Sequence, residues 1–291
     1  MRTRRYGPDD LDLAARSHSA KPGRTPMRRL SSLTEIDWIK DGVAHRAPEM
    51  PCTVAHCVPS MFEAYAKILH PIYEDLSVEE DGPTWDEEDK ANSAASPLHT
   101  DSVIANVLAR STLVYGGAKP GSRPVHLRWA QLARRLGLPF AATLSAASFT
   151  RRFSGGSWPQ SLIGPAEGSL AGAERDALAA VLSRHTMTGR CLFHLWLLAT
   201  ADWSEDFLFE GALEDVRRFP DEVPEARCTP THWFPDNRGW LVCSDYDLTF
   251  TLVGGPGALV HDLLEHPFLE CVAVRPETRV DWKADLDGPL Q

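Results

Sequence analysis

The sequence has no stretch of about 18 consecutive apolar residues, the length that a membrane-spanning helix requires. Its N-terminal segment also contains no apolar core of the kind found in signal peptides. These absences predict a soluble protein of the cytoplasm, with no membrane partner. Cysteine is sparse for a disulfide-stabilised protein: six cysteines are scattered along 291 residues, mostly inside apolar runs, where they serve as small buried hydrophobic residues.

Motifs for cofactors and nucleophiles are missing as well. The glycines after Val253 precede neither the Lys-Ser/Thr of a phosphate-binding loop nor the last glycine of a dinucleotide motif, because residue 260 is Val. There is no G-x-S-x-G turn to hold a nucleophilic serine. The acidic segment lacks the ligand spacing of an EF-hand, and Cys52 and Cys57 have no second ligand pair for zinc. We therefore predict no cofactor and no metal.

The charge is biased towards acid. A formal net charge of −10 and an isoelectric point near 5.5 argue against nonspecific binding to a phosphate backbone, so nucleic acid is not an expected partner. An acidic surface suits a basic protein partner instead. The 43% of hydrophobic residues, with 9 Trp and 11 Phe, are enough for a substantial core.

Composition divides the chain into three parts. Residues 1–29 hold eight Arg or Lys and predict a disordered basic tail. Residues 30–280 predict a single α+β domain, and residues 281–291 a C-terminal tail. Within the domain, nine carboxylates lie between Glu74 and Asp89, and a glycine- and proline-rich segment follows from Gly116. We interpret residues 74–123 as an acidic insertion, because such charge density is self-repelling.

The clearest pattern lies in residues 229–274. From Trp240 to Val253, apolar residues alternate with polar ones, which predicts a half-buried strand, or two strands bent at Ser244-Asp245, in a sheet with one wet face. Gly254-Gly255-Pro256-Gly257 then breaks the extended run. A helix is expected over 258–265, and a further strand over 269–274.

The remaining patterns complete the predicted fold. Apolar spacing predicts a short strand or helix in 58–71, helices over 102–114, 125–137, 145–153, 169–185 and 211–219, and strands over 191–200 and 207–209. Residues 191–200 are almost uniformly apolar, which is typical of a strand buried on both faces. We predict the α+β class, with a mixed, mostly antiparallel sheet formed largely by the C-terminal half and covered by helices from the N-terminal half.

Several blocks carry a resemblance to a known family. They are VPSMFEAYAKILHP, RWAQLARRLGLPF, ASFTRRFSGGSWP and THWFPDNRGWLVCSDYDLTFTLVGG, in this order along the chain. With these blocks the sequence resembles a family of uncharacterised bacterial proteins over residues 55–75 and 124–276. That resemblance implies one intact cytoplasmic domain with a variable acidic insertion. It implies no catalytic residue, because the family has no established activity.

Two groups of residues are candidate sites. An unbroken strand would place Asp245 and Asp247 on one face, about 6 to 7 Å apart, where paired carboxylates can perform acid–base chemistry with His261 close in sequence. The alternative is that these are ordinary solvated strand residues. Gly254, Gly255 and Gly257 would form the N-terminus of a helix, which can receive an anion, or they form only a structural turn.

Two functions from different classes remain open. The favoured one is a non-catalytic binding or protein-interaction protein, because aromatic residues are typical interface anchors and the central stretch is rich in them. The aromatic residues in question are Trp158, Trp233, Phe234 and Trp240, of which Trp233 and Trp240 are the ligand-binding candidates. The alternative is a small-molecule enzyme, a hydrolase, with its carboxylate pair beside the glycine-rich turn.

Overall fold

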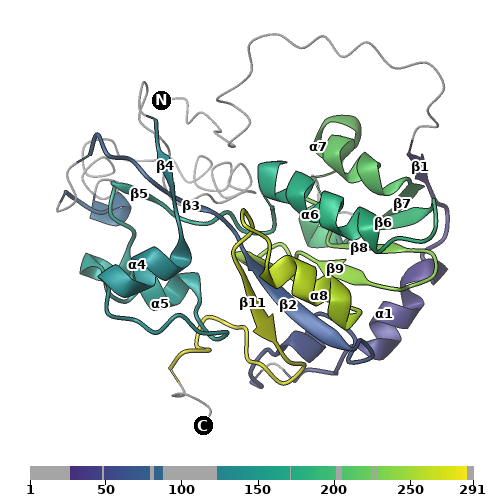
Figure 1. The fold of residues 1–291 in the computed structure, drawn as a ribbon, viewed down its shortest axis with the longest axis horizontal. Coiled ribbons are helices and arrows are strands. Elements are labelled where there is room, and N and C mark those ends of the chain that lie inside the picture. Colours follow the sequence, from purple (N-terminus) through teal and green to yellow (C-terminus); the bar gives the residue numbers. More distant parts are fainter. Residues whose placement is uncertain are drawn as a thin grey trace.

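The computed structural model describes residues 27–47, 49–78, 82–87, 123–170, 172–200, 205–224, 226 and 228–286. Its centre is an eight-stranded sheet with the strand order β1-β7-β6-β8-β9-β10-β2-β11 (Figure 1). The bounds are β1 Arg28–Arg29, β2 Ala64–Leu69, β6 Cys191–Leu195, β7 Phe207–Gly211, β8 His232–Pro235, β9 Leu241–Cys243, β10 Phe250–Gly255 and β11 Cys271–Val274. Neighbouring strands are antiparallel throughout this sheet. The predicted α+β class with a mostly antiparallel sheet is confirmed, and six of these strands follow residue 190.

A smaller unit lies at one side of the large sheet (Figure 1). It contains a three-stranded antiparallel sheet with the order β4-β3-β5, and two short helices. These elements are β3 Ile72–Glu74, β4 Val125–Leu127, β5 Leu162–Ile163, α4 Trp129–Arg135 and α5 Ala146–Thr150. The predicted helix over 125–137 is thus partly wrong: its first residues pair with β3 as a strand, and the helix begins at Trp129.

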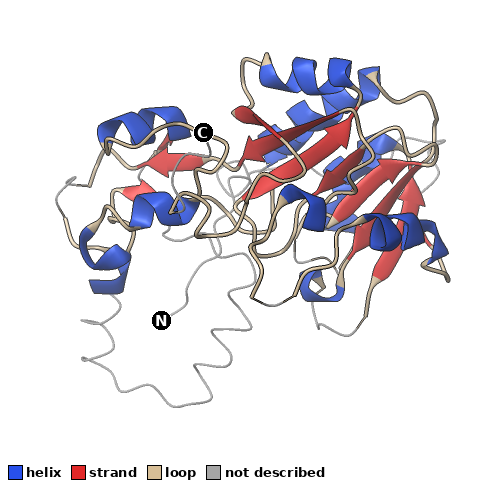
Figure 2. Ribbon diagram, turned by 90° about the horizontal axis from the view of Figure 1, so that it is seen from below, coloured by secondary structure: helices blue, strands red, loops and turns tan. Residues whose placement is uncertain are grey.

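Helices cover both faces of the large sheet (Figure 2). One face packs against α6 Gly172–Arg184, α8 Gly257–Leu264, η6 Leu213–Arg218 and α7 Phe219–Glu222, and the other against η2 Thr34–Ile36, α1 Asp37–Gly42 and η3 Val54–His56. Two further 3-10 turns are η4 Ser154–Gly156 and η5 Leu197–Ala199. The cover was predicted from the N-terminal half, but α8, η6 and α7 come from the C-terminal half.

Alternation along the strands decides which core each side chain enters. In β6, Phe193 and Leu195 pack into the core beneath α6 and α8, whereas Leu192 enters the core beneath α1. All five residues of β6 are buried, as the apolar run 191–200 predicted for a central strand. That strand is shorter than predicted, because the run turns into η5 after Trp196.

The run from Trp240 to Val253 forms two strands, which is the second of the two predicted alternatives. β9 and β10 pair with each other as a hairpin, with Leu252 opposite Cys243. The turn follows from Asp245, whose side chain accepts a hydrogen bond from the Tyr246 backbone N–H at 2.7 Å and whose carbonyl accepts one from Leu248 N–H at 3.1 Å. The predicted wet face is wrong, since every residue of β10 is buried between the two helical layers.

The other elements near the centre follow the predicted pattern closely. The segment 58–71, predicted as a short strand or helix, contains β2, which lies between β10 and β11. The helix predicted over 258–265 is α8, and the strand predicted over 269–274 is β11. The helix predicted over 102–114 lies outside the described residues.

The segments predicted as tails contribute some structure where they are described. Arg28 and Arg29 pair with Phe209 and Glu210 at one edge of the sheet. Near the other end, the side chain of Asp281 accepts a hydrogen bond from the Cys52 backbone N–H at 2.8 Å. Of the predicted insertion, residues 74–78, 82–87 and 123 are described, and the rest lies outside. None of the described helices is long and apolar enough to cross a membrane.

Candidate functional site

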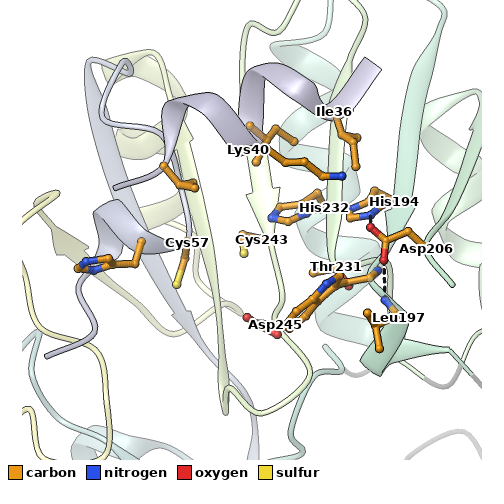
Figure 3. Close-up of a pocket in the computed structure, with 14 residues that line it drawn as sticks. Ile36, Lys40, Cys57, His194, Leu197, Asp206, Thr231, His232, Cys243 and Asp245 are labelled. Atoms are coloured by element: carbon orange, nitrogen blue, oxygen red, sulfur yellow. Dashed lines mark hydrogen bonds and ion pairs between the residues drawn. The ribbon is translucent and has the colours of Figure 1, made fainter. Parts of the chain in front are cut away.

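A cavity of about 430 Å³ lies between α1, η3 and the face of the sheet that these elements cover (Figure 3). Apolar side chains from η2, from α1 and from Val43 just after it form one wall, and polar side chains of β6, β8 and β9 form the other. The lining residues are Ile36, Ile39, Lys40, Val43, His56, Cys57, His194, Trp196, Leu197, Asp206, Thr231, His232, Cys243 and Asp245. A cavity of this size is typical of small-molecule sites.

Strand register brings the polar residues of this wall together. His194 of β6 lies opposite His232 of β8, and His232 lies opposite Cys243 of β9. Their strand neighbours Phe193, Trp233 and Val242 enter the opposite core. Because side chains alternate between the faces of a sheet, the three residues form one row that faces the cavity.

The two imidazoles and one carboxylate form a connected group, which we call the histidine relay (Asp206, His194 and His232). The rings of His194 and His232 are stacked, with centroids 5.3 Å apart and planes inclined by 7°. Their Nδ1 atoms lie 3.0 Å apart, and His194 Nε2 lies 3.2 Å from Asp206 Oδ2. The other carboxylate oxygen of Asp206 accepts the Leu197 backbone N–H at 3.0 Å.

The surroundings of the relay determine where its charges lie. Burial, together with the nearby His194, lowers the pKa of His232 to about 3, so His232 is neutral at pH 7. Burial alone would raise the pKa of Asp206, but hydrogen bonds from His194 and Leu197, with the charges of His194 and Lys40, lower it overall. Asp206 is therefore a carboxylate.

The hydrogen bonds of the relay show where its ring nitrogens donate and accept. The carboxylate of Asp206 can only accept, so His194 Nε2 carries a proton. The two Nδ1 atoms lie within hydrogen-bonding distance, so one imidazole donates there and the other accepts. The backbone carbonyl of Cys57 also hydrogen-bonds His232. The Asp206 carboxylate, His194 and His232 thus form a continuous chain of hydrogen bonds along the cavity wall.

Two other charged groups face the cavity from opposite ends. Figure 3 shows Lys40 beside the two histidines and Asp245 at the far end of the cavity. Burial, and then the charge of Asp247, raises the pKa of Asp245 to about 6. Asp245 therefore exchanges a proton close to neutral pH, which suits a general acid or base.

The structure brings some of the predicted site residues together and separates others. Asp245 and Asp247 both lie in the β9–β10 turn, where Asp245 lines the cavity and Asp247 is exposed. The pKa of Asp247 is raised, first by partial desolvation. His261 is exposed on α8, beyond the other end of β10, which spans about 17 Å for its six residues. It therefore belongs to neither the carboxylate pair nor the cavity.

The glycines predicted to bind an anion serve close packing instead. Gly254 and Gly255 are buried in β10, and a Cβ on Gly254 would lie 2.5 Å from the ring of Phe62. The first helical N–H, that of Gly257, donates to Glu63 Oε2 at 2.9 Å. A carboxylate of the chain itself thus occupies the position where an anion was predicted.

The predicted aromatic anchors lie inside the protein. Trp233 and Trp240 are 1% and 0% exposed and form an edge-to-face pair with ring centroids 6.2 Å apart. Trp158 and Phe234 are buried as well. These four rings fill the cores on the two sides of the sheet and therefore do not form an interaction surface.

The histidine relay was not predicted from the sequence. The run CLFHLWLLAT did contain a usable signal. Apart from Cys191, His194 is the one ionisable side chain in this otherwise apolar strand. A buried imidazole requires polar partners. Those partners, His232 and Asp206, come from separate parts of the chain, and strand pairing alone brings them together. In the described part of the chain, no three His, Cys, Asp or Glu side chains converge in a way that could hold a metal ion.

Comparison with known proteins adds no further assignment. No family model matches the chain, and neither a curated protein nor a solved structure matches it. The resemblance to the family of uncharacterised bacterial proteins stays a prediction.

Proposed function

We propose that this protein is a small-molecule enzyme that uses acid–base catalysis in the cavity, with hydrolysis as its reaction class. The observation that carries this proposal is the histidine relay in the cavity wall, facing a space that a small molecule can enter. A hydrogen-bonded Asp–His pair orients an imidazole and stabilises its protonated form. The interaction protein that the sequence favoured loses its support, because its aromatic anchors are buried.

The two ends of the cavity suit complementary roles. Both imidazoles of the histidine relay line the cavity, so the relay can pass a proton to a leaving group that displaces one of its internal hydrogen bonds. Asp245 at the opposite end, with a pKa of about 6, is mainly ionised at pH 7 and can accept a proton from water. A donor and an acceptor that face each other across bound substrate are the minimum arrangement for hydrolysis without a covalent intermediate.

The lining also limits the substrate. A cavity of about 430 Å³ admits molecules of roughly the size of an amino acid or a monosaccharide derivative. Its apolar wall of Ile36, Ile39 and Val43 favours a hydrocarbon portion, and Lys40 provides one cation for an anionic group. We therefore expect a small ester, amide or phosphoester with an apolar side.

The first test is a hydrolysis screen with small chromogenic esters, amides and phosphoesters. For any substrate that is turned over, His194→Gln and Asp206→Asn should lower kcat by about 10²- to 10⁴-fold, which is the usual contribution of a positioned acid or base. Asp245→Asn should remove the acid limb near pH 6 from the pH profile of kcat/KM.

A matched control exists outside the cavity. His185 Nε2 lies 2.9 Å from Asp262 Oδ2, where the end of α6 meets α8, and neither residue lines the cavity. His185→Gln removes a similar His–Asp pair and should leave turnover unchanged. Equal losses in His185→Gln and His194→Gln would show that the histidine relay has only a structural role, and the proposal would be rejected.

A thermal-shift screen covers the case in which no test substrate is turned over. A ligand at one hundred times its dissociation constant adds about 2.7 kcal/mol to the stability. Ligands of the cavity should stabilise the parent protein and His185→Gln but stabilise Asp245→Asn and Lys40→Met less. A ligand that stabilises all of these variants equally binds elsewhere, and that result would contradict the assignment of the cavity.

A further inference from the structure

Two thiols meet where η3 approaches the cavity. Cys52 and Cys57 lie on either side of this short turn, both partly exposed, and their side chains hydrogen-bond to each other. We infer that Cys52 and Cys57 are an oxidation site, which forms a reversible disulfide when a peroxide reaches it and thereby alters the wall of the cavity.

The backbone around the pair is held in place from both sides. The Thr53 backbone N–H donates to His56 Nδ1 at 2.9 Å, and Cys57 N–H donates to the Val54 carbonyl at 2.9 Å. The Cys52 N–H donates to Asp281 Oδ2 at 2.8 Å. The two thiols therefore stay adjacent without the cost of ordering a flexible loop, which favours their reaction with each other.

The two sulfurs differ in reactivity. The hydrogen bond from the Cys57 thiol has the largest influence on the pKa of Cys52 and, with the positive charge of Arg46, lowers it overall against the opposing effects of burial and of the Asp281 and Asp247 charges. The same hydrogen bond and burial raise the pKa of Cys57 well above its usual value. Cys52 is therefore the nucleophile, since the thiolate is the reactive form, and Cys57 is the thiol that resolves the first product.

The chemistry balances with hydrogen peroxide as the oxidant. The Cys52 thiolate attacks one peroxide oxygen, the O–O bond breaks, and the departing hydroxide takes a proton to give water and a sulfenic acid on Cys52. The Cys57 sulfur then attacks the Cys52 sulfur, the S–O bond breaks, and the Cys57 proton leaves with the hydroxide as a second water. Two thiols are oxidised to one disulfide, and one peroxide is reduced to two waters.

The oxidation site connects to the histidine relay through Cys57. Its side chain lines the cavity, and its backbone carbonyl hydrogen-bonds His232. A disulfide to Cys52 would rotate the Cys57 side chain and shift this carbonyl, and the environment of His232 would change. The disulfide itself does not depend on the proposed catalytic function, whereas an effect on turnover rests on that function.

Peptide mass spectrometry tests the bond directly. Trypsin cleaves after Arg46 and Lys67, so residues 47–67 form one peptide that contains Cys52 and Cys57 and no other cysteine. After brief peroxide treatment of the full-length protein and alkylation, this peptide should lose two hydrogen atoms and resist alkylation. Dithiothreitol should reverse both effects, and Cys52→Ser and Cys57→Ser should abolish them.

Other products would overturn the inference. A cross-link between peptide 47–67 and the peptide of Cys243 would show that the buried neighbour on β9 is the true partner. Irreversible addition of two or three oxygens to either cysteine, located by fragment ions because Met50 and Met61 lie in the same peptide, would show that the two thiols do not form a disulfide. The same conclusion would follow if neither cysteine reacted under conditions that oxidise exposed Met61. Cys191 is buried and is the internal control, expected to remain alkylatable only after unfolding.

Histidine NMR tests the connection to the cavity without any substrate. Oxidation should move the ring signals of His232, assigned with His232→Gln, and should leave those of His185 in place. Unchanged His232 signals in protein that carries the disulfide would reject the coupling while leaving the proposed acid–base function untouched.

Discussion

The Nζ atom of Lys67 lies 2.7 Å from the carbonyl oxygen of Leu144, and no part of the Lys67 side chain is exposed. A second carbonyl, that of Ala142, lies 3.0 Å away, and the Phe250 ring centroid lies 4.5 Å away. Burial lowers the pKa of Lys67 to about 7. A neutral amine has two N–H donors, which match the two carbonyls, and above pH 7 the lysine joins the large sheet to the loop before α5 mainly in this uncharged form.

Lys67 predicts that stability rises with pH. Between pH 7 and 10.5 the unfolded chain keeps a proton on this lysine that the folded chain has lost, so raising the pH favours folding. From pH 7 to 9.5 the gain should be about 2 to 3 kcal/mol. Urea unfolding of the parent and Lys67→Met at both pH values measures it, and the variant should lack this gain.

The lysine variant has a second expected effect and a control. Lys67→Met leaves the carbonyls of Ala142 and Leu144 without a donor, and at pH 9.5, where the cost of deprotonating Lys67 has largely gone, it should lower the stability by about 1 to 3 kcal/mol. Lys283 is exposed, so Lys283→Met should retain the pH dependence of the parent. A parent-like dependence in Lys67→Met would show that Lys67 is charged in the folded protein.

The buried imidazole of His70 predicts that the protein loses stability in acid. Its ring is buried between the Ala166 carbonyl at 2.6 Å and Thr251 Oγ1 at 2.9 Å, and burial lowers its pKa to about 4. Below pH 6.5 His70 binds a proton in the unfolded chain but not in the folded protein, so the free energy of unfolding decreases as the pH falls towards 4.

The size of the acid effect can be measured by substitution. By pH 4.5 His70 should account for about 2 to 3 kcal/mol of lost stability. His70→Gln should reduce the loss between pH 7 and 4.5, as determined from urea midpoints, whereas His45→Gln at an exposed position should not. If both variants lose as much as the parent, burial of His70 does not cause the acid sensitivity.

The strands and helices that were predicted correctly are those whose formation depends mainly on residues close in sequence. Apolar alternation after Trp240 identified the strands around the hairpin, and the glycine-proline segment identified the start of α8. The same alternation suggested a wet face, because Asp245, Asp247 and Thr251 share one parity. Thr251 is in fact buried, with its hydroxyl 2.7 Å from Ser244 Oγ and 2.9 Å from His70 Nε2. A hydroxyl that finds a partner can enter a core, and polarity alone does not reveal that partner.

The candidate site was harder to predict for a similar reason. Asp245 was identified from its place beside another carboxylate, and it lines the cavity. No sequence motif links His194, His232 and Asp206, because their proximity follows from the register of β6 against β7 and β8. Trp233 and Trp240 were predicted at the surface, yet aromatic residues in a strand pack equally well into a core.

Glu167 predicts a stabilising substitution. Burial, followed by the charge of Asp247, raises the pKa of Glu167 to about 7. Between pH 4.5 and 7 the folded chain keeps a proton that the unfolded chain has lost, so stability falls as the pH rises through this range. Glu167→Gln removes that penalty and should stabilise the protein at pH 8 by about 1 kcal/mol after allowance for screening by water.

The pH dependence distinguishes this cause from a general effect of the amide. At pH 4.5 Glu167 is largely protonated in the folded protein, so Glu167→Gln and the parent should differ little there. Glu277 is exposed, and Glu277→Gln should change the stability at neither pH. Thermal unfolding at the two pH values measures all three proteins, and equal stabilisation at both would contradict the electrostatic explanation.

At Gly254, where β10 crosses the segment before β2, there is no space for a side chain. An added Cβ would lie 2.5 Å from Phe62 Cδ2 and 2.9 Å from Val58 Cγ1, distances that require both side chains to move. Phe62 packs edge-to-face against Tyr65, with centroids 6.2 Å apart, and this contact restricts its movement. Gly254→Ala should therefore cost about 1 to 3 kcal/mol, although alanine is intrinsically less costly to order than glycine.

At Gly189 an added Cβ meets nothing within 4 Å, so Gly189→Ala is the matched control and should change the urea midpoint little. Equal midpoints for the two variants would show that the ring of Phe62 yields freely and that the close approach of β10 does not require glycine.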